Sequence, residues 1–391
     1  MKKLLIFSIL TYLLLTINSS AITKNSQKNV VENEKILKIG ILLPLSGKFK
    51  DAGESFLKAI QLALFDIGNK NIKIYPKDSG ANSLDSYLSA MEFKKLGIKI
   101  VIGPIFHESL EKLGKVNDIT FISLTNITNK IPKNIIAFGI NADSQIDTLK
   151  KYFKKKEISK TLLLSPKSHF SNQVKIIEDS KLKFYKVFLY SDIPKRITDD
   201  IKKITNYQER KKNLERRIEI LKHSELYKDK KELEELEQKH TLGKVSFDSV
   251  IVVDFGERLK SVLTSFLFSD ISSEDVNFFT LNQWFDKTLF NENASQNLYF
   301  PAIDFDNLKK FKKKYLDSYE EKPNVVSILA YDALGLIYYC WLNNNAHFET
   351  NQLYNKNGFK GLHGKFVIKN NLSKHQLGIY KVHKKKFLRV Y

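Results

Sequence analysis

The sequence predicts an α/β protein with two lobes, and three observations support this fold class. Apolar runs typical of buried parallel strands alternate with amphipathic segments at helical spacing from residue 36 onward. The chain has 391 residues, more than a single hydrophobic core usually accommodates. Residues 199–240 interrupt the alternation, because they are dense in Lys, Arg and Glu and place their few apolar residues at helical spacing. We therefore expect two lobes, with a charged helical hairpin inserted in one of them.

The first 21 residues have the pattern of a secretory signal peptide. Two lysines precede an apolar run over residues 4–17, and small residues lead to Ala21. The run is shorter than the roughly 20 residues that cross a bilayer as a helix. The single cysteine, Cys340, does not follow this run, where a lipid anchor would be attached. We expect cleavage after Ala21 and a periplasmic protein without lipid or a transmembrane segment.

The first sheet is expected to begin after a polar leader at residues 22–35. Strands are predicted where apolar residues run together and end at Gly, Pro or Ser, and helices where apolar residues recur every three to four positions. Their alternation predicts a parallel sheet with helices on its faces. The predicted strands are 36–43, 72–75, 98–102 and 119–123, and the predicted helices are 52–67, 84–96 and 108–115.

A second α/β unit follows, and the last 30 residues contain two antiparallel-looking strands, 364–368 and 378–382. We place residues 36–141 and 301–345 in lobe one. Residues 142–300 and 346–391 form lobe two, which carries the insertion 199–240. The predicted strands of this part are 161–164, 183–190, 249–254, 276–281 and 298–301, and the helices are 145–153, 172–179, 257–268, 306–319 and 325–342.

The formal net charge of +21 is strongly basic, but it does not predict a nucleic-acid site. Lysine carries most of the positive charge, and arginine, the residue best suited to bidentate phosphate contacts, is rare. One cysteine excludes an intramolecular disulfide, so the fold depends on buried apolar area. We expect a lysine-rich solvated surface and no nucleic-acid partner.

Four short segments resemble the leucine-binding-protein type of periplasmic receptor, whose members have the two-lobed type I periplasmic binding protein fold. They are 44–47 (PLSG), 61–63 (QLA), 102–104 (IGP) and 330–333 (AYDA). This resemblance covers nearly the whole chain after the leader. It implies a hinge between two lobes and, as one function, a receptor that delivers a branched-chain type of amino acid to the permease of an ABC transporter.

A narrower resemblance is to the penicillin-binding protein activator family of Gram-negative bacteria. It is carried by the charged insertion before 247–250 (FDSV), by 282–286 (NQWFD), by 332–334 (DAL) and by the glycine-rich 358–366 (GFKGLHGKF). This resemblance implies a non-catalytic protein that activates a peptidoglycan-synthesising penicillin-binding protein. We take this as the first functional hypothesis, with the amino-acid receptor as the alternative. The insertion is either a solvated hairpin or an arm that contacts the partner.

Candidate ligand contacts lie at predicted strand ends, because open α/β sheets bind ligands at the carboxyl ends of their strands. The resemblance assigns small hydroxyls such as those of Ser123 and Thr125 to a ligand carboxylate, whereas Phe170 and Ser171 stand where the receptors have Tyr-Gly. Residues of these types also serve as turn caps or packing. The full candidate set is Ser46, Phe106, His107, Ser123, Thr125, Phe170, Asp254 and Trp284.

Catalytic and metal-binding patterns are not visible in the sequence. It has no HExxH helix, no GxSxG elbow, no P-loop and no cysteine pair. The eight histidines are scattered without ligand spacing, which favours surface or capping roles. Asp254 and Asp332 are expected to cap backbone amides. We therefore expect no catalytic residue, no cofactor and no bound metal.

Overall fold

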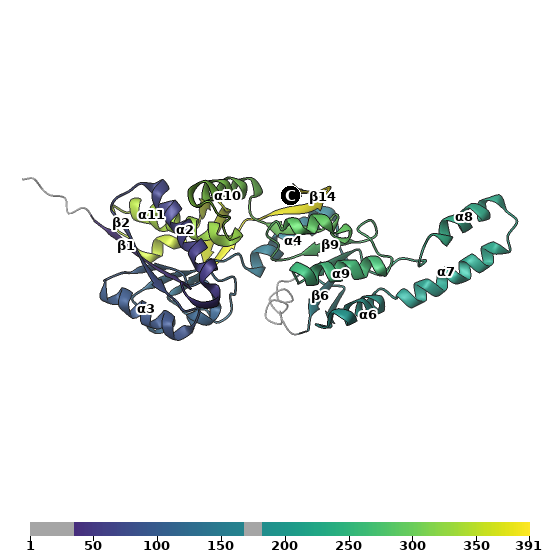
Figure 1. Cartoon of the computed structure of the whole chain (residues 1–391), viewed down its shortest axis with the longest axis horizontal. Helices are drawn as coiled ribbons and strands as arrows, with labels where there is room; N and C mark the ends of the chain where they lie inside the picture. The colour runs from purple at the N-terminus through teal and green to yellow at the C-terminus, as the bar shows by residue number, and fades with distance from the viewer. Residues whose placement is uncertain (1–34, 168–181) are drawn as a thin grey trace, which may run out of the picture. The chain divides into compact units, whose positions relative to one another are not determined.

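Two mixed sheets organise the chain in the computed structural model, which describes residues 35–167 and 182–391 (Figure 1). Both sheets lie within one compact unit, residues 37–391. The first sheet has eight strands in the order β11-β12-β13-β5-β4-β3-β1-β2, and the second has seven in the order β15-β14-β10-β9-β8-β6-β7. This two-sheet α/β architecture is the fold class that the sequence predicts.

The inner parallel strands of the first sheet, β1, β3, β4 and β5, are buried on both faces, because helices cover each side. Ile39 and Ile41 of β1 join the core cluster that contains α2 and α11, whereas Leu42 joins the cluster that contains α3. This is the alternation of faces expected of a strand. The elements are β1 (Leu37–Leu43), α2 (Lys50–Ile67), β2 (Ile72–Asp78), α3 (Ser83–Lys95), β3 (Ile100–Ile102), β4 (Thr120–Ser123), β5 (Ile135–Ala137), α11 (Ile328–Leu342), β11 (Phe359–Gly361), β12 (Gly364–Lys369) and β13 (Leu372–His375).

The second sheet is built in the same way, with α4 on one face and α6 and α9 on the other. Leu163 of β6 packs in the cluster of α4, and its neighbours Leu162 and Leu164 pack in the cluster of α9. The elements are α4 (Ala142–Lys156), β6 (Thr161–Pro166), β7 (Lys186–Tyr190), α6 (Pro194–Ile204), β8 (Ser249–Val252), α9 (Gly256–Phe268), β9 (Asn277–Thr280), β10 (Tyr299–Ala302), β14 (Gly378–His383) and β15 (Lys386–Arg389). The helix α10 (Phe305–Tyr319) follows β10 but packs against α2, a helix of the first sheet, where the Tyr319 hydroxyl donates to the Lys58 carbonyl at 3.0 Å.

The strands near the carboxyl end are divided between the two sheets, which corrects part of the expected division. Residues 346–391 were expected in lobe two, but β11, β12 and β13 join the first sheet, where Leu372 pairs with Ala137 of β5. They cover an edge of β5 that would otherwise be unpaired. β14 lies antiparallel to β10 in the second sheet. The chain thus passes between the sheets after β5, after β10 and after β13.

The charged insertion begins later than residue 199. Residues 199–204 belong to α6, which has Pro194 in its first turn and buries Ile197 and Ile201 as it packs beside α9. α6 is therefore a layer helix of the second sheet. Beyond it, α7 (Tyr207–Lys222) and α8 (Tyr227–Glu237) run side by side and form the inserted hairpin (Figure 1). We call residues 206–240 the arm.

Two predicted helices are not seen as helices of the predicted length in the described residues. The predicted helix 172–179 lies outside the described residues, and the predicted helix 108–115 consists of two short 3-10 helices, η2 and η3.

In the described ranges, the segment Val325–Leu342 has the length and hydropathy to cross a membrane, but most of it is buried and its helix α11 packs against α2. The 3-10 helices are η1 (Gly47–Phe49), η2 (His107–Leu110), η3 (Leu113–Lys115), η4 (Lys287–Asn291), η5 (Asn293–Ser295), η6 (Val325–Ser327) and η7 (Thr350–Tyr354).

Candidate functional site

Ser123 and Thr125 lie at the carboxyl end of β4, and both side chains are buried. The Ser123 hydroxyl donates to the Pro104 carbonyl at 2.9 Å, and its oxygen accepts from the Thr125 N–H at 3.3 Å. The Thr125 hydroxyl accepts from the Ile127 N–H at 3.2 Å. Both hydroxyls therefore hold the turn after β4 in place, which is a common role of such residues.

Ser46, Phe106 and His107 lie after β1 and β3. The Phe106 ring packs against Phe49, with 4.4 Å between ring centroids, and His107 Nε2 lies 2.7 Å from the Asn129 carbonyl oxygen. Ser46 is exposed and its hydroxyl binds the Asp78 carboxylate. Partial burial favours the neutral acid, but this bond and three from backbone N–H groups outweigh burial and lower the pKa of Asp78.

Asp254 follows β8 and is the centre of a buried polar cluster. Its Oδ2 atom accepts from the Tyr190 hydroxyl at 2.5 Å and lies 3.1 Å from Arg258 Nε. Its Oδ1 atom accepts from the Phe255 N–H at 2.9 Å, so Asp254 binds a backbone amide as expected, although the first turn of α9 has no side-chain cap. Burial, reinforced by the bond to Asp254, raises the pKa of Tyr190. The carboxylate is fully engaged by groups of the second sheet.

The last two candidates, Trp284 and Phe170, provide no evidence for a ligand site shared with the other candidates. Trp284 is half-buried, packs against the main core, and donates its backbone N–H to Gln283 Oε1 at 3.1 Å. Phe170 lies outside the described residues. The described candidates are thus each engaged by other groups of the protein, and ligand contact by this set stays a prediction.

Asp332 and His363 form a buried pair that joins two distant segments of the sequence. Asp332, in α11, accepts from the backbone N–H groups of Leu362 and His363, each at 2.8 Å, and also contacts His363 Nδ1. The expectation that Asp332 caps backbone amides is confirmed. A Cβ atom on Gly361 would lie 2.5 Å from the Asp332 carboxyl carbon, so glycine is required there.

His363 is linked in turn to a second buried histidine, so for these two the surface role, one of the two roles expected of the histidines, is excluded. His363 Nε2 lies 2.9 Å from His375 Nδ1, and His375 Nε2 lies 2.6 Å from Ser373 Oγ and 3.1 Å from the Phe138 carbonyl oxygen. Burial, together with the neighbouring His363, lowers the pKa of His375 well below its ordinary range. The described residues contain no group of three or more His, Cys, Asp or Glu side chains that could hold a metal.

A buried arginine fixes the base of the arm. Arg210 donates through Nε to the Thr205 carbonyl at 3.0 Å, through Nη1 to Thr241 Oγ1 at 2.7 Å, and through Nη2 to the Ser269 carbonyl. Thr241 is itself bound to Asp270 through its N–H and its hydroxyl. Burial lowers the pKa of Arg210, although the Asp270 carboxylate opposes this effect. Within a run of charged residues, no sequence signal distinguishes this arginine from its exposed neighbours.

The two helices of the arm are held together by a small core and one ion pair. Leu214, Leu221 and Leu236 are buried between them. Arg217 makes a two-bond contact with Glu232, at 2.9 and 2.7 Å. The three leucines form a small apolar contact for two paired helices. The two parallel hydrogen bonds between Arg217 and Glu232 supplement it and fix how the helices face each other. The arm is therefore a paired hairpin with its own apolar seam.

The arm ends in an apolar tip. Ile220, Leu226 and Tyr227 lie at the end of α7, in the connecting turn and at the start of α8, and they are 57%, 62% and 83% exposed. Three large exposed apolar side chains within residues 220–227 of a charged hairpin are unusual for a purely solvated surface. We call these three residues the tip.

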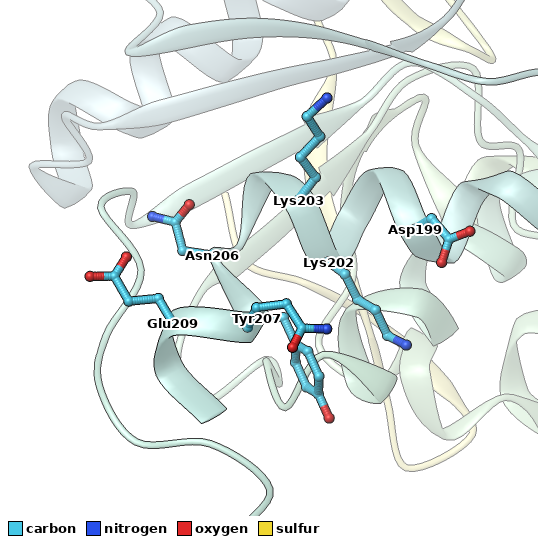
Figure 2. Close-up of a pocket in the computed structure, with 7 residues that line it drawn as sticks. Asp199, Lys202, Lys203, Asn206, Tyr207 and Glu209 are labelled. Atoms are coloured by element: carbon cyan, nitrogen blue, oxygen red, sulfur yellow. The ribbon is translucent and has the colours of Figure 1, made fainter. Parts of the chain in front are cut away.

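A hollow of about 440 Å³ marks the joint between α6 and α7 (Figure 2). Lys202 Nζ lies 5.3 Å from the centre of the Tyr207 ring, a cation–π contact across the joint. Asn206, which precedes α7, has a left-handed φ of 49°. The hollow is open and its charges are mixed, so its chemistry favours no single ligand class. Its lining residues are Asp199, Lys202, Lys203, Asn206, Tyr207, Gln208 and Glu209.

Solved structures that are similar to this chain include a regulator of PBP1A and a substrate binding protein of an amino-acid transporter. The C-domain of LpoA (YraM) from Haemophilus influenzae, described as a regulator of PBP1A, has a TM-score of 0.62 and 15% identity over 90% of this chain and 100% of that domain. Full-length LpoA from the same organism has the same score and identity, and this chain covers 59% of it. The branched-chain amino acid transporter substrate binding protein LivJ from Streptococcus pneumoniae, solved with isoleucine, has a TM-score of 0.54 and 15% identity over 91% of this chain and all of that one.

These similarities show the two-lobed type I periplasmic binding protein fold. No curated protein matches the sequence. The family model "LppC putative lipoprotein" matches residues 25–233, more than half of the chain. The resemblance to penicillin-binding protein activators is thereby confirmed at the level of the family. The chain belongs to the LppC family.

Proposed function

We propose that this protein is a non-catalytic periplasmic regulator that binds and activates a penicillin-binding protein engaged in peptidoglycan synthesis. Membership of the LppC family and the fold shared with a regulator of PBP1A support the proposal. The proposal places the protein in the periplasm without a lipid anchor. The family model, by contrast, is described as one of lipoproteins.

The observation that points to a contact surface for the partner enzyme is the exposed tip of the arm. A contact between proteins draws most of its affinity from a few large apolar or aromatic anchors near its centre. Ile220, Leu226 and Tyr227 are anchors of this kind, and Tyr227 is almost entirely exposed. Arg210 at the base and the Arg217–Glu232 pair hold the helices that present them. We infer that the tip contacts the partner enzyme.

Affinity capture from periplasmic and membrane extract tests the proposal, with a fluorescent penicillin used to identify captured penicillin-binding proteins. The intact mature protein should capture one. A variant with Ile220→Ser, Leu226→Ser and Tyr227→Ser should lose it, since the anchors are gone. A matched control removes three apolar residues that are exposed elsewhere, Phe65, Leu84 and Leu88, and should capture normally.

The outcomes separate the function from the role of the arm. Capture of a transporter permease in place of a penicillin-binding protein would overturn the proposed function. Equal capture by the tip variant and the intact protein would leave the function standing and remove the tip from it. Replacing residues 206–240 by a short Gly-Ser link tests the whole arm in the same way.

The alternative function is a receptor for an amino acid of branched-chain type, working with an ABC transporter permease. The fold shared with LivJ, whose structure contains isoleucine, favours it. Against it, the buried hydroxyls of Ser123 and Thr125 are already engaged by backbone groups, the carbonyl of Pro104 and the N–H of Ile127. We therefore rank the receptor second.

A further inference from the structure

A separate hollow of about 410 Å³ lies between the β14–β15 hairpin, η4 and the start of α10. Its size is that of small-molecule sites, which are commonly about 300–1,000 Å³. Its lining combines aromatic rings with many basic side chains and few acidic ones. We call it the aromatic–basic hollow; its lining residues are Lys287, Phe290, Asp304, Phe305, Asp306, Lys309, Tyr380, Lys385, Lys386, Phe387, Leu388 and Arg389.

The aromatic rings of the hollow are fixed by one another. Phe387 packs 4.6 Å from Phe290 and 5.6 Å from Phe305, measured between ring centroids. Phe305 stacks on the buried Phe285 at 4.4 Å, and its backbone N–H donates to the Tyr380 hydroxyl at 3.0 Å. A flat apolar ligand would therefore meet rings that are already ordered, which reduces the entropy lost on binding.

The charges of the hollow do not cancel. Asp304 lies 3.4 Å from Arg389 and Asp306 lies 2.7 Å from Lys309, so each acidic residue already has a basic partner. For Lys287, Lys385 and Lys386 the described part of the chain provides no ion pair. The surplus charge extends to Lys312, whose pKa is lowered by burial and by the nearby Lys287.

The turn that carries Lys385 is conformationally costly. Lys384 and Lys385 both adopt left-handed backbone angles, with φ of 46° and 58°, in the turn between β14 and β15. The turn between β12 and β13 has the same pair of left-handed residues and uses Asn370 and Asn371, which tolerate this region well. Lysine is less suited to this backbone than asparagine, and the turn places the charge of Lys385 at the hollow.

We propose that the aromatic–basic hollow binds a small ligand that carries a phosphate or carboxylate on a flat apolar body. The rings receive the apolar body, and Lys287, Lys385 and Lys386 bind the anion. This site and the tip of the arm share no residue, so the inference is independent of the proposed function.

Isothermal titration calorimetry of the mature protein with 1-naphthyl phosphate tests the site. We expect saturable binding that weakens as sodium chloride rises from roughly 0.05 to 0.5 M, because salt screens the lysines. 1-Naphthol and inorganic phosphate each supply half of the chemistry and should bind at least about tenfold more weakly, a difference of about 1.4 kcal/mol. Equal binding of 1-naphthol would overturn the anion part of the proposal.

A charge-reversal pair locates the binding. Lys385→Glu with Lys386→Glu should weaken binding of 1-naphthyl phosphate by about tenfold or more, because like charges repel across a contact. Lys230→Glu with Lys231→Glu, two adjacent exposed lysines of α8, is the matched control and should leave binding unchanged. Equal loss in both variants would overturn the site. Binding to phosphatidylglycerol vesicles without binding to soluble 1-naphthyl phosphate would assign the hollow to a membrane surface and overturn the small-ligand proposal.

Discussion

The Nε2 atom of His363 lies 2.9 Å from the Nδ1 atom of His375, and both rings are buried. A carbonyl oxygen only accepts, so the contact with Phe138 requires a proton on His375 Nε2. In the neutral ring Nδ1 is then an acceptor, and His363 donates to it. Phe138 follows β5 and His375 ends β13, the strands after which the chain passes to the second sheet. The contact between His375 and Phe138 therefore joins the two points at which the chain leaves the first sheet for the second.

This arrangement predicts that the protein loses stability in mild acid. In the unfolded chain His375 takes up a proton below about pH 6.5. In the folded protein its pKa is lowered by burial and by His363, so the unfolded state binds more protons as pH falls. This one group should lower the free energy of unfolding by about 2 kcal/mol between pH 7.5 and pH 5. Urea unfolding at pH 5, 6, 7 and 7.5 measures it.

Two variants isolate the contribution of His375. His375→Gln keeps an amide that can donate to Phe138 and removes the titrating group, so its stability should depend less steeply on pH than that of the parent. His347→Gln changes a largely exposed histidine and should leave the pH dependence unchanged. An unchanged slope in His375→Gln would show that other groups cause the acid sensitivity.

Gly361 is expected to tolerate no side chain. Alanine there would place Cβ 2.5 Å from the Asp332 carboxyl group, and the resulting overpacking should cost about 1–3 kcal/mol of unfolding free energy. Gly335, in the middle of α11, has open space around its Cβ position, and Gly335→Ala should be neutral or stabilise by about 0.5–1 kcal/mol. Thermal unfolding of the two variants decides the matter, and similar melting temperatures would contradict the expected clash.

The positions of the inner parallel strands could be predicted from the sequence, because a strand that is buried on both faces has a continuous run of apolar residues. β1 and β8 are examples. The strands near the carboxyl end were harder to place, because a hairpin pairs with any free sheet edge and its residues do not specify which. The contact between Asp332 and His363 spans 31 residues and joins a helix to a turn, so no local pattern predicts it. For Ser123 the predicted position at a strand end is correct, but its bond to Pro104 depends on a neighbouring strand.

Arg210 should contribute far more to stability than Arg217. Arg210→Ala removes three hydrogen bonds in a buried place and leaves carbonyl acceptors unpaired, at a cost of about 1–3 kcal/mol or more. Arg217→Ala breaks a solvent-accessible pair with Glu232 and should change stability much less, because ion pairs in water contribute little. Limited proteolysis should cut the arm faster in Arg210→Ala, because its base is loosened. Equal proteolysis rates in the two variants would show that Arg210 does not anchor the arm.

The mass of the native protein tests the expected export and processing. Cleavage after Ala21 without lipid predicts a mass equal to the chain from Ile22 to Tyr391. Because Cys340 is buried in α11, it is no site for a lipid in the folded protein. Intact-mass spectrometry of protein isolated from the periplasm is the measurement. A mass that retains the leader or includes acyl groups would contradict the expectation.

An amino-acid screen separates the regulator from the receptor. A receptor at 100 times the dissociation constant of its ligand gains about 2.7 kcal/mol of stability by mass action, which thermal unfolding detects readily. We expect no shift with leucine, isoleucine or valine, because the hydroxyls of Ser123 and Thr125 are engaged by the turn after β4. A variant that combines Ser123→Ala and Thr125→Val is the control. It should lower stability without a ligand, because it removes the bonds that hold the turn. A clear shift of the parent with any of these amino acids, absent in that variant, would make the receptor function the better interpretation of the fold.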